Sequence, residues 1–371
     1  ERLGPLDTPN GTISTNHDEV ERIAMSPVTN TSRSTKLDKP RRKKPATMAD
    51  VAAHAKVSPS TVSFVLSDNA EISISEDTRQ RVFDAARELG YRRNAAARAL
   101  ASRRTSLLGV VSDVLSSPFG GDAVIGAQKE ARKHDFHVLM AALEYDETLN
   151  KEPIQPLLDM QVEALVVMMT THFAIDVPHE LDGIPTMLVN CFDPTGRVSS
   201  ITPDEERAGQ EATEYLISQG HRRIGLINLE PQRVAAIGRR AGYEQALKQA
   251  GITPAPELIV EGSAQATGGY VGATKLLNLE HPPTAIFAAT DRIAMGAYDA
   301  IKERGLRIPQ DISVLGFDDQ EIITHHLRPT LTTMKLPFKK MARRAVELLA
   351  DNLDGNAAPL IEVYAEFPDT V

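Results

Sequence analysis

The chain from Leu107 onward alternates short aliphatic runs with stretches of helical periodicity. The aliphatic runs are SLLGVV (106–111), FHVLMAA (136–142), ALVVMM (164–169), PTMLVN (185–190), RIGLIN (223–228), ELIVEG (257–262), AIFAAT (285–290) and ISVLGF (312–317). The helical stretches lie near 121–134, 204–219, 239–250, 268–279, 291–304 and 338–353. Apolar strands without polar alternation, separated by helices, predict parallel sheets that are covered on both faces.

So many strands exceed one comfortable sheet, and the pattern therefore predicts two doubly wound α/β lobes with a cleft between them. In sheets of this kind, ligands bind at the carboxyl ends of the strands. We expect a binding site where the strand ends of the two lobes face each other.

Residues 47–90 carry a different pattern, which predicts three short helices. Thr47 with Asp50 forms a variant of the capping box, and Ser58 followed by Pro59 is typical of a helix N-terminus. The third helix is expected to begin near Ser75 and to stop at Gly90. Its predicted apolar stripe is Val82, Phe83, Ala86 and Leu89. Two short helices joined by a tight turn, with a third behind them, indicate a helix-turn-helix unit.

The second of these helices, SPSTVSFVL (58–66), has an unusual outer face. Val62, Val65 and Leu66 fall on one side and can pack inward. The opposite side is small or polar and entirely uncharged, whereas a solvated helix face normally carries charge. A recognition helix that enters a DNA groove needs short side chains shaped to the base edges, so this face fits a DNA reader.

Charge is distributed unevenly along the 371 residues, although the formal net charge is −9. Residues 41–106 hold 13 Lys and Arg against 7 Asp and Glu, whereas residues 107–371 hold 23 against 37. A basic segment ahead of an acidic body suits a polyanionic partner such as nucleic acid, with a solvated surface as the alternative. Residues 1–45 are rich in polar residues and proline, and we predict a disordered tail.

Other features bound the function classes. A single cysteine excludes an internal disulfide and fits a reducing cytosol, and no apolar run is long enough to span a membrane. The first residues lack the pattern of a signal peptide, so export is not expected. The histidines and Cys191 show no metal spacing, and no nucleophile–base pair or phosphate loop is visible. We therefore expect no metal, no cofactor and no enzymatic activity.

Taken together, these motifs resemble the lac repressor family of bacterial transcription regulators from about Ala46 to the C-terminus. The resemblance rests on TMADVAAHAKVSPSTVSFVL (47–66), on RRAGY (239–243), on AIFAATDRIAMGAYDAIKERGLRIPQDISVLGFDD (285–319) and on PTLTTMKLP (329–337). It implies a DNA-binding helix-turn-helix domain over 46–91, a hinge-helix linker over 92–105, and a two-lobed ligand-binding and dimerisation domain over 106–371. The two lobes would resemble periplasmic binding proteins.

The resemblance also implies DNA-contacting residues. The positions that match base-reading residues are Pro59, Ser60 and Phe64. Those that match phosphate contacts are Thr47, Ser58, Thr61, Ser63 and Asn69. In the hinge, Leu100 matches a leucine that wedges between central base pairs, with Ala97 beside it. The chain departs from the family at Phe64, where many members carry Arg, and a phenyl ring cannot pair with guanine but can contact a thymine methyl.

In the cleft, the resemblance carries over five ligand positions: Phe119, Asn190, Arg239, Thr290 and Asp318. The guanidinium of Arg239 suits ligand hydroxyls or a carboxylate. Each has a structural alternative; Asp318 could cap a helix and Phe119 could belong to the core. Asp291 is interpreted as a helix cap rather than a ligand contact. Ala264 stands where some sugar-responsive members present an aromatic residue, which argues against simple stacking of a hexose.

The expected molecule is a homodimeric, cytoplasmic, nucleoid-associated regulator, with repression favoured over activation. It would bind a pseudo-palindromic DNA operator and respond to a small effector, a sugar or sugar derivative. The rival interpretations are an activator of the same family and a soluble sugar-binding receptor of the same two-lobed fold. The receptor would leave the basic segment 41–106 without a purpose and would need export.

Overall fold

The computed structural model describes residues 46–66, 73–92, 99, 104–114, 117–143, 149, 152–353 and 361–362. Contacts divide the chain into two compact units, residues 1–93 and residues 94–371, and each is described by itself. The predictions for the tail, for most of the hinge, and for Asn69, Ala97 and Leu100 lie outside the described residues.

The first unit contains the three predicted helices, α1 (Met48–Ala55), α2 (Pro59–Leu66) and α3 (Glu76–Glu88). Thr47 and Asp50 form the capping box of α1, and Ser75 caps α3. The Oγ of Ser58 accepts from the backbone N–H of Thr61 at 3.1 Å at the start of α2. The buried core of the unit is Val51, Ala52, Ala55, Val62, Val65, Val82 and Ala85. The helix-turn-helix prediction is confirmed.

The predicted stripe on α3 is partly wrong. Val82 is buried, but Phe83 is 43% exposed and Leu89 is 36% exposed. Ala85 takes a core position instead. Ala85 follows Val82 by three positions and so shares its helix face, whereas Phe83 points about 100° away from Val82 around the helix.

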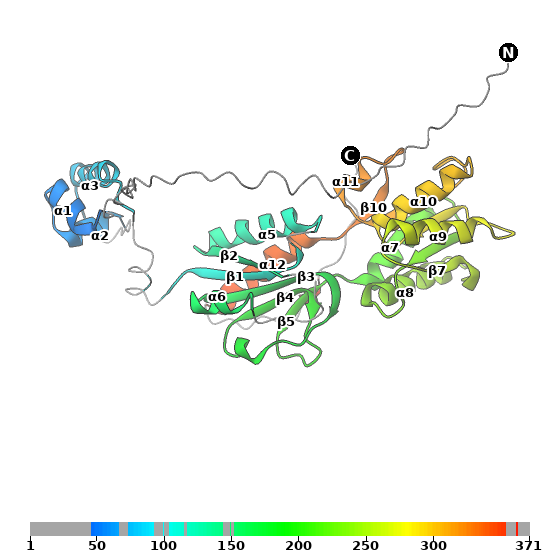
Figure 1. The fold of residues 1–371 in the computed structure, drawn as a ribbon, viewed down its shortest axis with the longest axis horizontal. Helices are drawn as coiled ribbons and strands as arrows, with labels where there is room; N and C mark the ends of the chain where they lie inside the picture. The colour runs from blue at the N-terminus through cyan, green and yellow to red at the C-terminus, as the bar shows by residue number, and fades with distance from the viewer. Residues whose placement is uncertain are drawn as a thin grey trace, which may run out of the picture. The chain divides into compact units, whose positions relative to one another are not determined.

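The second unit contains two parallel sheets, one in each lobe (Figure 1). The first consists of β1 (Leu107–Ser112), β2 (His137–Ala142), β3 (Ala164–Ala174), β4 (Thr186–Phe192), β5 (Ser199–Thr202) and β11 (Ile361–Glu362), in the order β11-β5-β4-β3-β1-β2. The second consists of β6 (Ile224–Asn228), β7 (Ile259–Glu261), β8 (Ala285–Ala288), β9 (Ser313–Asp318) and β10 (Thr332–Lys335), in the order β10-β9-β8-β6-β7. Leaving β11 aside, the two orders are equivalent, so the lobes share one doubly wound topology.

Among the described residues, six longer helices cover the sheets: α5 (Gly120–Lys133), α7 (Glu205–Ser218), α8 (Val234–Gln249), α9 (Ala266–Leu277), α10 (Asp291–Glu303) and α12 (Phe338–Leu353). Helices α5 and α12 pack together on the first sheet, whereas α7 pairs with α8 and α9 with α10 on the second. Shorter pieces are α6 (Gln155–Asp159), α11 (Glu321–Thr324) and 3-10 turns at His179–Leu181 and Pro256–Leu258. No helix in the described residues is long and apolar enough to cross a membrane.

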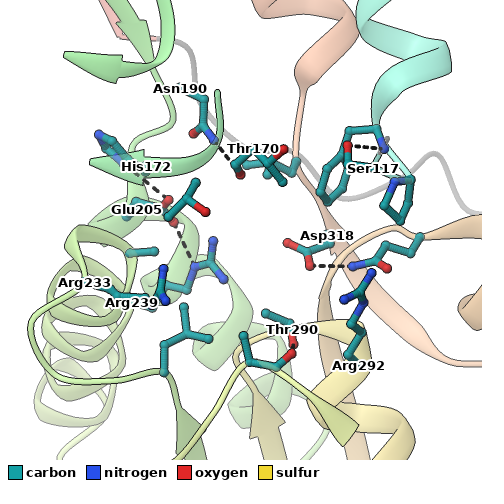
Figure 2. Close-up of a pocket in the computed structure, with 18 of the residues that line it drawn as sticks. Ser117, Thr170, His172, Asn190, Glu205, Arg233, Arg239, Thr290, Arg292 and Asp318 are labelled. Carbon is teal, nitrogen blue, oxygen red and sulfur yellow. Dashed lines mark hydrogen bonds and ion pairs between the residues drawn. The ribbon is translucent and has the colours of Figure 1, made fainter. Parts of the chain in front are cut away.

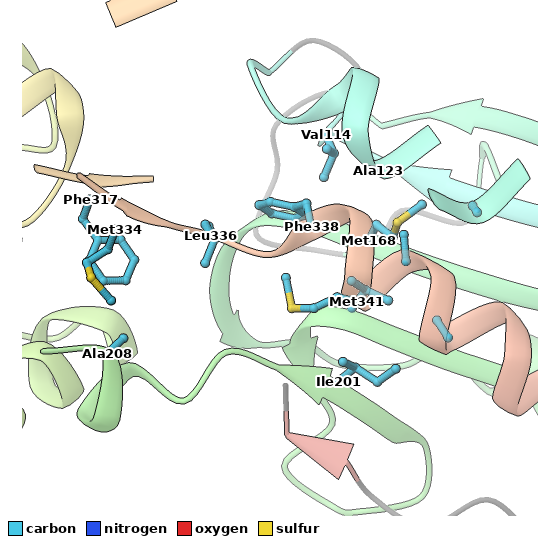
Figure 3. Packing of buried hydrophobic residues seen from close by; sticks show 14 of the residues in the cluster. Val114, Ala123, Met168, Ile201, Ala208, Phe317, Met334, Leu336, Phe338 and Met341 are labelled. Carbon is cyan, nitrogen blue, oxygen red and sulfur yellow. The ribbon is translucent and has the colours of Figure 1, made fainter. Parts of the chain in front are cut away.

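The chain passes from one lobe to the other after equivalent strands. It leaves the first sheet after β5, through Pro203, to form α7 on the second lobe. It returns after β10, through Leu336 and Pro337, to form α12 on the first lobe. Figure 3 shows this return, with Leu336 between Met334 and Phe338. A single hydrophobic cluster therefore contains residues of both lobes.

The strands predicted from aliphatic runs are all present, which confirms the two-lobed α/β fold. The sequence pattern did not predict β5, β10, β11, α6 and α11, which are short and lack a continuous aliphatic run or a helical repeat. The predicted start of α8 near Arg239 is also wrong, because the helix begins at Val234. The N-cap there is Arg233, which makes no side-chain capping bond, so the sequence carries no start signal.

The close approach of α7 and α8 makes one glycine a test of the packing. A Cβ on Gly242 would collide with the backbone of Glu206 and Gln210 in α7. We expect Gly242→Ala to lower the free energy of unfolding by about 1–3 kcal/mol, despite the better helix propensity of alanine. Urea denaturation of the full chain measures this. The control is Gly121→Ala in α5, where a Cβ meets nothing within 4 Å; an equal loss in both variants would contradict the packing argument.

Candidate effector cavity and DNA-binding face

A cavity of about 480 Å³ lies between the two lobes (Figure 2). Strand ends from both sheets border it, as expected for doubly wound folds. Its lining mixes apolar side chains with polar ones from both lobes and includes residues of β3, β4, β9, the N-terminal part of α7, and α8. The lining residues used below are Asp113, Phe119, His172, Asn190, Glu205, Arg233, Arg239, Ala264, Thr290, Arg292, Asp318 and Gln320.

All five predicted ligand positions line this one cavity. Asn190 lies in β4 and Asp318 ends β9, whereas Arg239 projects from the middle of α8. Phe119 precedes α5 and stacks on Phe338 with ring centroids 4.8 Å apart. The structure thus brings together residues that are as far as 199 positions apart in the numbering, from 119 to 318. Their contact with a ligand stays a prediction.

Two capping interpretations are resolved by hydrogen bonds. The hydroxyl of Thr290 accepts from the backbone N–H of Ile293 at 3.1 Å, so Thr290 is the N-cap of α10 and the assignment of Asp291 as that cap is wrong. Helix α11 is preceded by Gln320, so Asp318 does not cap it. Asp318 is left with its carboxylate at the cavity wall, 8% exposed.

Asp291 has a different role, because its fully buried carboxylate ties two neighbouring segments together. One oxygen accepts from the backbone N–H of Gln320 at 2.6 Å, and the other accepts from the hydroxyl of Thr333 at 2.5 Å. At the end of β9 the backbone takes positive φ at Asp318 (117°) and at the following Asp319 (58°). Such conformations cost about 1–3 kcal/mol each and persist only when their surroundings hold them. The hydrogen bond from the backbone N–H of Gln320 to Asp291 is one contact that stabilises this conformation.

Burial and the closeness of two acidic groups also shift their ionisation. Burial, and then the neighbouring Asp318, raise the pKa of Asp291 well above its ordinary value of 3.8. Burial likewise raises the pKa of Asp318, against the opposing influence of Arg239. Two carboxylates in one low-dielectric region cannot both ionise without cost.

Several polar groups that line the cavity were not predicted from the sequence, among them Glu205, His172 and Gln320. Glu205 forms a buried ion pair with Arg239, 34 positions later, at 2.8 Å. His172 extends from the end of β3 toward Glu205, with 3.5 Å between Nδ1 and Oε1. Gln320 donates from Nε2 to Asp318 at 2.9 Å. No short-range pattern in the sequence predicts these contacts, because they form only when α7, α8 and the strand ends come together in the fold.

The predicted DNA-contacting residues of the first unit lie on α2 and at the start of α1. Ser58, Pro59, Ser60 and the cap residue Thr47 are exposed, and Phe64 is 36% exposed. Thr61 and Ser63 are half-buried. The hydroxyl of Ser58 lies 2.7 Å from that of Ser60 and 2.8 Å from that of Thr61, so the N-terminal turn of α2 presents a cluster of small hydroxyls. This outer face is free of charged side chains, as expected from the sequence.

A helix-turn-helix unit joined to a two-lobed domain with a polar cavity defines a class of protein: DNA-binding regulators that respond to small molecules. No group of three potential metal ligands occurs in the described part of the chain. Two family models match, one for bacterial regulatory proteins of the lacI family over residues 47–94, the other for the periplasmic binding protein-like domain over residues 213–369. The chain belongs to the lacI family, whose members are transcriptional regulators rather than enzymes.

Individual relatives and solved structures agree with this family assignment. The chain is 34% identical over 309 residues to the ribose operon repressor of Haemophilus influenzae, covering 83% of this chain and 92% of the relative. It is 32% identical over 311 residues to the repressor CytR of Escherichia coli, covering 84% and 90%. Among solved structures it is similar to the lac repressor bound to ONPG (TM-score 0.67, 29% identity, 87% of this chain and 98% of the other). It is also similar to the complex of the regulator CelR with cellobiose (TM-score 0.61, 28% identity, 88% and 98%).

The raised pKa of Asp291 generates a prediction. A carboxyl with a raised pKa binds more protons in the folded than in the unfolded chain, so its contribution to stability falls as pH rises from about 4 toward neutral. Asn at this position can accept from Gln320 and donate to Thr333 without ionising. We expect Asp291→Asn to gain stability relative to the wild type by up to about 1.4 kcal/mol per pH unit across this window.

Urea denaturation of both proteins at several pH values measures the difference. The control is Asp299→Asn, an exposed position on the same helix. A stability difference between Asp291→Asn and wild type that does not change with pH would show that Asp291 does not resist ionisation.

Proposed function

We propose that this protein is a transcriptional repressor that binds a pseudo-palindromic operator as a homodimer. Binding of a sugar in the cavity between its lobes would either lower or raise the affinity for the operator. The observation that carries the proposal is the convergence of polar groups from both lobes on one cavity, in a chain that also carries a helix-turn-helix unit. A ligand held by both lobes favours one lobe arrangement, and this couples its binding to that of DNA.

The DNA contacts proposed are those of α2 and the α1 cap. Pro59, Ser60 and Phe64 would face base edges, and Thr47, Ser58, Thr61 and Ser63 would hold phosphates through hydroxyls near helix N-termini. Asn69, Ala97 and Leu100 complete the proposed set. Such a protein acts in the cytoplasm at the nucleoid. A sugar receptor of the same fold would have no use for the uncharged, exposed face of α2.

The ligand contacts proposed are Phe119, Asn190, Arg239, Thr290 and Asp318, which line the cavity together. Ribose is the first sugar to test, because a relative covering 83% of this chain is the ribose operon repressor. Ala264 also lines the cavity and offers no ring on which a sugar could stack. Recognition would then depend on hydrogen bonds.

The deciding experiment titrates the purified protein onto a duplex from its own upstream region that contains a pseudo-palindrome. A random duplex is the control, at two salt concentrations, with and without D-ribose and other sugars. We expect tight binding to the first duplex only, changed at least about tenfold by one sugar. Equal binding to both duplexes that is lost as salt increases would show that only electrostatic attraction to the phosphates is at work. This result would reject the proposed sequence specificity.

Phe64 allows a sharper test of the recognition face. An apolar contact to a thymine methyl contributes to discrimination between bases, so Phe64→Ala should lose about tenfold or more in operator affinity with little change on random DNA. Phe83→Ala is the matched control, since Phe83 is also an exposed phenylalanine, on α3 of the same unit. Equal losses on operator and random DNA would remove Phe64 from the base-reading set.

A further inference from the structure

The cavity contains a cation that already has its own counter-ion. Arg239 donates from Nε to Glu205 at 2.8 Å, and the two side chains are only 4% and 5% exposed. One terminal nitrogen of Arg239 donates to the carbonyl of Ala289. The ring of Phe317 lies against the guanidinium, 3.5 Å from its central carbon. The guanidinium is therefore held on several sides, and its charge is neutralised from within the protein.

Glu205 stays ionised in this position. Burial acts to raise its pKa, but the charge of the Arg239 guanidinium and the nearby imidazole of His172 outweigh burial, so the pKa is lowered from its ordinary value. Figure 2 shows Glu205 between His172 and Arg239 at the cavity wall. Truncating one member of such a pair leaves the other buried without a counter-ion, which is costly.

The cavity also presents buried acceptors that lack donors. Asn190 donates from Nδ2 to the carbonyls of Met169 and Thr170 at 2.9 and 3.0 Å, which fixes the amide and leaves Oδ1 buried. Gln320 is fixed by its bond to Asp318, which leaves Oε1 buried. Neither oxygen has a hydrogen-bond partner within the described residues. One lies in each lobe, so a ligand that supplies a donor to each would hold the lobes together.

These features discriminate between ligand chemistries. An unsatisfied buried acceptor is costly, and a hydroxyl can satisfy it, whereas an ionised carboxylate or phosphate group brings no donor. Two further cations line the cavity. Arg233 pairs with Glu230 at 2.7 Å. Arg292 donates to the side-chain oxygen of Gln265 at 3.2 Å and lies close enough to Asp318 to oppose the rise that burial causes in the pKa of that carboxyl. An anionic ligand would have to compete with Glu205 for Arg239.

We propose that Glu205 is the residue that sets the charge class of the effector. By neutralising Arg239 it restricts the cavity to uncharged, hydroxyl-rich compounds that donate to both Asn190 and Gln320, and it excludes sugar acids and phosphorylated sugars. Hydroxyls can also accept from the remaining N–H groups of Arg239. The inference rests on the sugar effector proposed above and specifies its chemistry.

The first test uses the wild-type full chain and matched pairs of probes. Thermal unfolding is followed with D-ribose against D-ribonate and D-ribose 5-phosphate, and with D-glucose and D-galactose against their aldonates. We expect at least one neutral sugar to raise Tm by several degrees while its acid and phosphate give no shift. An acid or phosphate that raises Tm as much as its neutral partner would overturn the charge selectivity and leave the sugar effector standing. No shift with any compound would reject the sugar effector and, with it, this selectivity.

The second test changes the counter-ion. Glu205→Gln keeps the shape of the side chain but removes the negative charge that neutralises Arg239. We expect this variant to bind the sugar acid at least tenfold more tightly than the wild type does. Its preference for the neutral sugar over the corresponding acid should therefore decrease. Glu206→Gln, an exposed neighbour on α7, is the control and should behave as the wild type. A folded Glu205→Gln protein that still excludes every acid would show that Glu205 does not set the charge class. If that variant does not fold, the wild-type comparison decides alone.

Discussion

The effector cavity depends on one buried carboxylate, that of Asp291. It bonds to the backbone after β9 and to the hydroxyl of Thr333 in β10, and so holds Asp318 and Gln320 at the cavity wall in a backbone conformation that few residues adopt. Gly316 is required beside it, because a Cβ there would collide with the Asp291 carboxylate. The interaction lies behind the cavity rather than in it, so it shapes recognition without touching a ligand.

Much of the fold could be predicted because parallel strands that are buried on both faces appear in the sequence as continuous aliphatic runs. The runs at 164–169 and 285–290 became β3 and β8. The five ligand positions met in one cavity for a related reason, since carboxyl ends of parallel strands gather at one edge of a sheet. All five were assigned by family resemblance, and Arg239 differs from the others because it lies within a helix, α8, and not at or just after a strand end.

What the sequence could not predict are the pairings that arise only in three dimensions. Glu205 is one acid among many in a helix rich in them, and nothing beside it indicates that it meets Arg239 across a helix pair. Asp291 stands at a helix start, where a cap is the ordinary interpretation, yet the neighbouring Thr290 is the cap. Sequence rules based on neighbouring residues predict the most common role of a residue type, such as helix capping by Asp. In buried polar networks, tertiary contacts can give the residue a different role.

The reciprocal crossing of the chain after β5 and β10 has a consequence for dividing the protein. The two lobes have equivalent strand orders, each crossing follows the fifth strand, and each places the next helix on the other lobe. A cut after α7 would leave the first half without α12, which packs on its sheet, and the second half without α7, which packs against α8. Each lobe is therefore completed by a helix from the other half of the chain.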